Sequence, residues 1–140
     1  MYTGIKHFHS GLAYLLLAGL VIAIIYAIAS RKKRFTAGSR KVALLGLVCA
    51  HLQFVAGIVL YFLSPLGASN FSGDAMKEKV SRLYIIEHPL MMLIAVILVT
   101  IGYSRAKKLN SNSKKYNSII LFYSIALILM LSAIPWNVWP

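Results

Sequence analysis

Cysteine is almost absent from this chain of 140 residues. The single thiol, Cys49, cannot form an internal disulfide, and one cysteine cannot supply a CxxC pair, a CxxCH haem-attachment sequence or a zinc site. Because Cys49 lies within an apolar run, we expect it to be a small buried packing residue. Covalent attachment of a c-type haem is therefore excluded.

Charged residues are also scarce, at 13% of the chain against 59% hydrophobic residues. A soluble domain has about 25% charged residues, and a soluble chain this short would leave much of its apolar area in water. Lipid is the more natural solvent, and the length allows one domain, residues 1–140. The net charge is +12, and the basic residues that produce it fall between apolar runs. No aromatic or glycine pattern typical of RNA or DNA recognition surrounds them, so we expect no nucleic-acid partner.

Four long apolar stretches make up most of the chain. They cover approximately residues 7–30, 42–64, 83–103 and 117–136. About 20 helical residues cross a hydrocarbon core of ~30 Å, and backbone groups in lipid must bond within their own segment. The sequence therefore predicts an all-α polytopic membrane protein, a four-transmembrane-helix bundle.

The basic residues are distributed unevenly between the connections. Segment 31–41 carries six Lys and Arg and segment 105–115 carries five, whereas the other side has four, namely Lys6, Lys77, Lys79 and Arg82. By the positive-inside rule the two richer connections are cytoplasmic, so both termini are non-cytoplasmic. The basic block directly after the first stretch also indicates a retained helix rather than a cleaved signal peptide.

The outer loop, residues 65–82, is the only sizeable segment outside the spans. Its first part is irregular in composition, and residues 75–86 are compatible with an amphipathic helix on the membrane surface. It contains no GxSxG, HExxH or phosphate-binding glycine sequence. We therefore expect no independent catalytic activity.

Glu87 is the only acidic residue within a predicted span. An ionised carboxylate in lipid must be paired, protonated or close to water, so Glu87 has either a structural partner or a role in ligand orientation, proton transfer or quinone contact. Pro89 removes the amide that would bond the Ile85 carbonyl, which predicts a kinked helix that begins before Glu87.

All four histidines lie in or at the edge of the spans. His9 and His88 are both close to the outer face, whereas His51 is several ångströms deeper. For an iron held by two histidines, His9 with His88 is the best matched pair, and His51 with His88 requires a tilted second helix. His7 cannot share the inward face with His9, because residues two apart differ by about 200° around a helix.

Gln53 belongs to a stripe of small residues in the second span, with Gly46, Ala50 and Gly57. Such a stripe lets two helices approach closely, and Gln53 is expected to bond across the contact. Gly11 and Gly19 in the first span are expected to be close-packing positions for the same reason.

The chain resembles small bacterial four-helix integral membrane proteins that are labelled cytochrome b-like. The residues that carry this resemblance are His9-Ser10, Ala50-His51 with Gly57 and Tyr61, Arg82 with Glu87-His88, and Ile134-Pro135-Trp136. The resemblance covers most of the chain and implies a four-helix protein of a bacterial cytoplasmic (inner) membrane that holds b-type haem.

The leading interpretation is a haem b-binding protein that transfers electrons within the membrane, with quinol as a candidate donor. His9, His88 or His51 would supply the axial ligands, Arg82 would pair with the haem propionates, and Glu87 would orient a ligand or accept a proton. Two alternatives stay open. One is a cofactor-free accessory or assembly subunit of a larger membrane complex. The other is a small proton-coupled transporter subunit that uses Glu87 and His51 and forms a homo-oligomer.

Overall fold

The computed structural model describes residues 1–140 and is entirely helical. Four helical runs are long and apolar enough to cross a membrane, which confirms the all-α class and the number of candidate spans. These runs are α1 (Tyr2–Ala29), α2 (Ala37–Leu63), the continuous run Lys79–Lys108 and α6 (Asn112–Ser132). The third run consists of α4 (Lys79–Arg82), a π-helical segment (Leu83–Glu87) and α5 (His88–Lys108).

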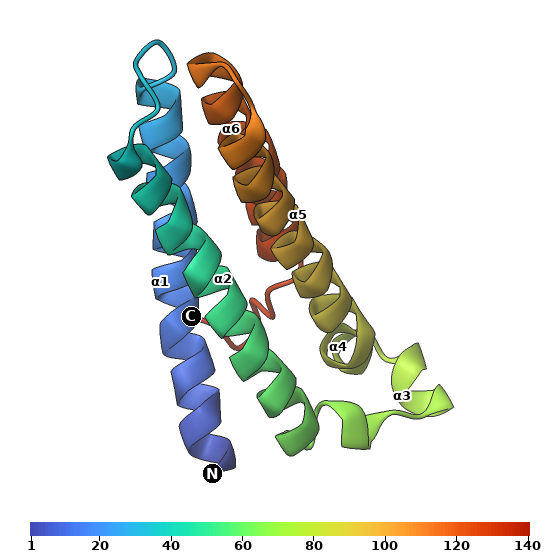
Figure 1. The fold of residues 1–140 in the computed structure, drawn as a ribbon. Helices are drawn as coiled ribbons and strands as arrows, with labels where there is room; N and C mark the ends of the chain where they lie inside the picture. The colour runs from blue at the N-terminus through green and yellow to red at the C-terminus, as the bar shows by residue number, and fades with distance from the viewer.

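The four long helices form an up-down-up-down bundle. α1 and α5 each pack against α2 and α6, so α1 and α5 lie diagonally across the bundle (Figure 1). The short connections 30–36 and 109–111 lie together at one end, which we call the basic end (Figure 1). The long connection, with a 3₁₀ turn (Ala68–Asn70) and α3 (Gly73–Lys77), lies at the opposite end, which we call the acidic end.

The helix ends extend beyond or stop short of the predicted apolar stretches. α2 begins at Ala37 rather than near residue 42, because Thr36 and Ser39 form a reciprocal capping box around its first turn. α6 ends at Ser132 rather than near residue 136, so its predicted C-terminal boundary is wrong. Pro135 has no amide with which to continue the helical hydrogen bonding.

Small residues on α2 set the distance between the helices. A Cβ on Gly19 of α1 would lie 3.7 Å from the Gly46 Cα of α2, so the two backbones approach closely here. Tyr123 of α6 is fully buried, and its hydroxyl donates to the Ala43 carbonyl at 2.6 Å. Cys49 is buried as predicted. The expectation for Gly11 is wrong, because a Cβ there would meet nothing within 4 Å.

The amphipathic helix expected over residues 75–86 is not continuous. α3 ends at Lys77, and Glu78 has an extended backbone with φ −88° and ψ 132° before α4 begins. The Ser81 hydroxyl donates to the Glu78 carboxylate at 2.8 Å, so Glu78 acts as the start of a second helix. The break separates the surface turn α3 from the helical run that enters the bundle.

Candidate functional site

Two histidines meet between the diagonal helices at the acidic end of the bundle. His9 lies on α1 and His88 is the first residue of α5, and both are half-buried. Their ring centroids are 6.3 Å apart and the ring planes are inclined at 83°. Helical phase gives the expected result for the neighbouring histidine, since His7 is exposed. The structure thus brings together the two histidines that match in depth.

The His88 ring is oriented by the end of α6. Its Nδ1 lies 2.8 Å from the Ala133 carbonyl oxygen. A carbonyl oxygen can only accept, so Nδ1 carries the proton and Nε2 of the neutral ring keeps its lone pair. Metal-binding histidines commonly have this arrangement, with one ring nitrogen donating to a backbone carbonyl and the other left for the metal.

The His9 ring lies against Gly57 of α2. A Cβ on Gly57 would be 3.1 Å from His9 Cε1 and 3.7 Å from Nδ1, so a larger residue here would press on the ring. The Gln53 side chain donates to the His9 backbone carbonyl at 2.9 Å, which is the cross-helix bond expected of it. Two buried polar atoms, His9 Nδ1 and Gln53 Oε1, have no hydrogen-bond partner within the protein. Buried polar atoms are usually paired, so each of these two atoms can bond a further group at this position.

The helix that presents His88 is locally widened. The His88 amide donates to the Leu83 carbonyl, five residues back, which defines the π-helical turn Leu83–Glu87. Pro89 supplies no amide to the Ile85 carbonyl, and the Tyr61 hydroxyl of α2 donates to that carbonyl at 2.9 Å instead. The expectation of a disturbed helix that begins before Glu87 therefore agrees with the structure. Single π-turns occur frequently at functional sites in helices.

Glu87 is paired rather than isolated. Its Oε1 accepts from Arg82 Nε at 3.2 Å, and Arg82 Nη1 donates to the Met76 carbonyl at 3.3 Å. Both side chains of the ion pair are a little under half exposed. The charges of Arg82 and Glu87 thus neutralise each other at the acidic end of the bundle. Glu87 directly precedes His88 in the chain.

The structure places His51 away from the pair. Its Nε2 lies 2.9 Å from the Thr100 hydroxyl, and that hydroxyl donates its only proton to the Val96 carbonyl at 2.7 Å. His51 Nε2 must therefore be the donor, so it has no free lone pair. Thr100 follows His88 by 12 residues, or roughly 18 Å along α5. His51 is exposed on the side of the bundle and is a helix-linking residue.

The fold contains no group of three or more His, Cys, Asp or Glu that could hold a metal ion. A metal at this site would have two protein ligands, His9 and His88, with the remaining ligands coming from elsewhere. This requirement matches a porphyrin, which surrounds its iron with four nitrogens and leaves two axial positions to the protein.

Three contributors to the site were not identified from the sequence as parts of it. Gly57 was assigned to a packing stripe, and the Ala133 carbonyl belongs to a residue without a polar side chain. Tyr61 has no partner that the sequence identifies, although the missing amide of Pro89 shows that the Ile85 carbonyl needs a donor.

No protein-family model, curated protein or solved structure matches this chain.

Proposed function

We propose that this chain is an integral membrane protein that binds one b-type haem between His9 and His88 and transfers electrons within the membrane. The convergence of these two side chains from diagonal helices carries the proposal. Metal–imidazole bonds of about 2.0–2.1 Å place two rings on opposite sides of one metal with centroids roughly 6 Å apart. The observed centroid separation is 6.3 Å.

The surrounding residues support a cofactor at this position. The Ala133 carbonyl leaves Nε2 of His88 as its ligating atom, and the His9 ring has an unpaired nitrogen. The haem would supply a one-electron redox centre, for which quinol is the candidate electron donor. Arg82 would exchange part of its contact with Glu87 for a haem propionate, and Glu87 would then be free to accept a proton.

The cofactor requires the helices to separate at the acidic end. Two open cavities of the fold, about 440 and 210 Å³, are lined by residues of the basic end and do not include the histidine pair. A porphyrin held by both histidines would insert between α1 and α5. We expect the π-helical turn Leu83–Glu87 to be the element that yields, because Pro89 supplies no amide to the helical hydrogen bonding there.

The proposal includes an orientation in the membrane, with the basic end of the bundle on the cytoplasmic side. The two short, strongly basic connections lie at one end of the bundle, and the three acidic residues, Asp74, Glu78 and Glu87, belong to the other end (Figure 1). The basic end faces the cytoplasm by the positive-inside rule. The histidine pair then lies in the outer half of a bacterial cytoplasmic membrane, with both termini outside.

An absorption spectrum tests the proposal. The chain is expressed with ample haem, purified in mild detergent and recorded in the oxidised and dithionite-reduced forms. A Soret band is expected in the wild type, and it should be lost in H9A and in H88A. H7A and H51A are matched controls that remove one imidazole each, from the exposed face of α1 and from the distant Thr100 contact, and both should keep the full haem content.

A wild-type protein without a Soret band, or full haem content in H88A, would overturn the proposal. A haem-free chain that co-purifies with a stable larger complex would support an accessory or assembly subunit instead. The proton-coupled transporter receives no support from the geometry, because Glu87 is paired with Arg82 and His51 is bonded to Thr100, far along α5.

A further inference from the structure

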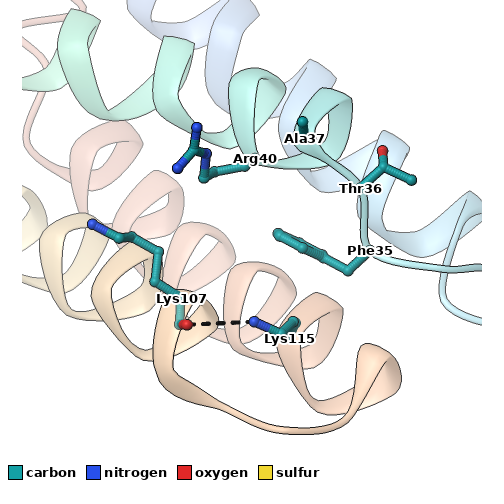
Figure 2. A pocket seen from close by; sticks show the side chains of 6 residues that line it. All are labelled: Phe35, Thr36, Ala37, Arg40, Lys107 and Lys115. Carbon is teal, nitrogen blue, oxygen red and sulfur yellow. Dashed lines mark hydrogen bonds between the residues drawn. The ribbon is translucent and has the colours of Figure 1, made fainter.

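An open cavity of about 440 Å³ lies at the basic end, far from the histidine pair. Figure 2 shows that the connection before α2, α2 itself, α5 and α6 surround it. Its lining residues are Phe35, Thr36, Ala37, Arg40, Lys107 and Lys115. Half of them are cations, and none is acidic.

The positive charge of this cavity has no internal counter-ion. The chain has only three carboxylate side chains, and all of them lie within residues 74–87 at the acidic end. The two ion pairs of the fold, Lys77 with Asp74 and Arg82 with Glu87, also belong to that end. A recess with low-dielectric walls that carries one sign of charge concentrates ions of the opposite sign. The cavity is therefore suited to an anion.

One of the three cations is already fixed in place. Lys115 Nζ donates to the Ala106 carbonyl at 2.8 Å and to the Lys107 carbonyl at 3.4 Å, and it lies 5.4 Å from the Phe35 ring centroid. Phe35 is held in turn by its amide, which donates to Asn112 Oδ1 at 3.0 Å. These bonds tie the connection before α2 to the junction between α5 and α6. One side of the cavity is thus held together by contacts between the three segments.

The other two cations remain available. Arg40 and Lys107 are exposed. Lys107 Nζ lies 5.5 Å from the Tyr103 ring centroid, a contact that leaves its ammonium open to an anion. Figure 2 shows that they extend from α2 and α5 toward the same side of the hollow. The first turn of α2, at Thr36 and Ala37, also borders the cavity, and the positive end of its helix dipole adds to the attraction for an anion.

We propose that this cavity binds the phosphate of an anionic phospholipid headgroup, with Arg40 and Lys107 as the principal contacts. The membrane source follows from position. Arg40 and Lys107 lie where the candidate spans α2 and α5 reach their polar ends, at the level of the headgroups, and Phe35 offers an apolar surface beside them. Basic recesses between transmembrane helices on the cytoplasmic side are sites of this kind. The proposal does not depend on haem binding.

The test compares two charge-matched double variants. Wild type, R40A/K107A and K32A/K33A are purified in an uncharged detergent, and phosphatidylglycerol binding is titrated by native mass spectrometry, with phosphatidylcholine as the uncharged reference. Lys32 and Lys33 are exposed in the neighbouring connection, so the control loses the same charge from the same end. At about 1 kcal/mol per basic residue, R40A/K107A should bind phosphatidylglycerol roughly 30-fold more weakly. K32A/K33A should stay within about twofold of the wild type, because screening weakens charges outside the recess.

Three results would overturn the proposal. One is a wild type that shows no preference for phosphatidylglycerol over phosphatidylcholine. Another is an equal loss of binding in both double variants, which would indicate general attraction to a basic surface. The third is displacement of the lipid by an equal concentration of inorganic phosphate, which would assign the site to a free anion. Circular dichroism melting of R40A/K107A without lipid should match the wild type, since both side chains are exposed.

Discussion

At the scale of single residues, the candidate site depends on a hydroxyl of one helix that replaces a hydrogen bond missing from another. Pro89 leaves the buried Ile85 carbonyl without its helical donor, in one of the candidate spans. Tyr61 of α2 donates to that carbonyl at 2.9 Å. The same bond fixes α2 beside the π-helical turn, and α2 carries Gly57, against which His9 lies. The hydrogen bond that Pro89 removes from one helix is thereby replaced by a defined contact with another.

A double-mutant cycle tests this compensation. Y61F should lower the free energy of unfolding by about 0.6 kcal/mol, the mean for hydrogen bonds between membrane helices, because the Ile85 carbonyl loses a donor. In a P89A background the new amide of residue 89 can bond that carbonyl, so Y61F should then have little effect. Unfolding of the four chains in mixed detergent, followed by circular dichroism, measures the coupling. Equal effects of Y61F in both backgrounds would show that Tyr61 does not compensate for Pro89.

At the scale of elements, close contacts at glycine hold the helix pairs together. α5 and α6 meet at Gly102, where an added Cβ would lie 2.6 Å from Phe122 Cβ and 3.3 Å from the Ser118 carbonyl oxygen. The Ser118 hydroxyl also donates to the Gly102 carbonyl at 2.9 Å. α1 and α2 meet less tightly at Gly19 and Gly46, where a Cβ on Gly19 would lie 3.7 Å from the Gly46 Cα. These contacts set how each helix is rotated, and that rotation decides which side chains face the interior.

Glycine substitutions separate packing from helix propensity. G102A should destabilise the bundle by about 1–3 kcal/mol, because α6 has to shift to admit a single methyl group. G11A is the matched control, since a Cβ there meets nothing within 4 Å. It should be neutral or stabilising by up to about 1 kcal/mol, the gain of alanine over glycine within a helix. The same detergent unfolding assay compares the two variants, and equal stabilities would contradict the tight contact at Gly102.

At the scale of the whole molecule, the histidine pair and the cation-lined cavity lie at opposite ends of the helix bundle. The acidic end holds the histidine pair, the Arg82–Glu87 ion pair and every carboxylate side chain. The basic end holds the two short connections and the cation-lined cavity. A helix of more than 20 residues separates these ends by about 30 Å, so they can act on opposite sides of one membrane.

Cysteine labelling tests the proposed orientation. In a C49A background, a single cysteine is introduced at Asn70 in the long connection or at Ser113 near the start of α6. N70C should react with a membrane-impermeant maleimide in intact cells, because the long connection is expected outside. S113C should react only after the membrane is permeabilised. The reverse pattern would show that the protein is inserted with its basic end outside.

The sequence by itself determined the four helical spans and the unequal charge of their connections. Both features are local: apolar side chains add along one segment, and in lipid the backbone of that segment can satisfy its hydrogen bonds only as a helix. The depth of each histidine follows from the same one-dimensional count. This is why His9 and His88 could be matched before any packing was known, and why His7 could be assigned to the other face of α1.

Only the tertiary structure decided which side chains meet. The separation of His51 from His88, the pairing of Arg82 with Glu87 and the fixing of Lys115 beside Phe35 all require the rotation and offset of one helix against another. Those quantities come from contacts between segments distant in sequence, such as Gly19 with Gly46 and Gly102 with Phe122. Apolar surfaces in lipid have no strong preference among rotations, so small residues and a few hydrogen bonds select one, and a hydropathy pattern does not show which.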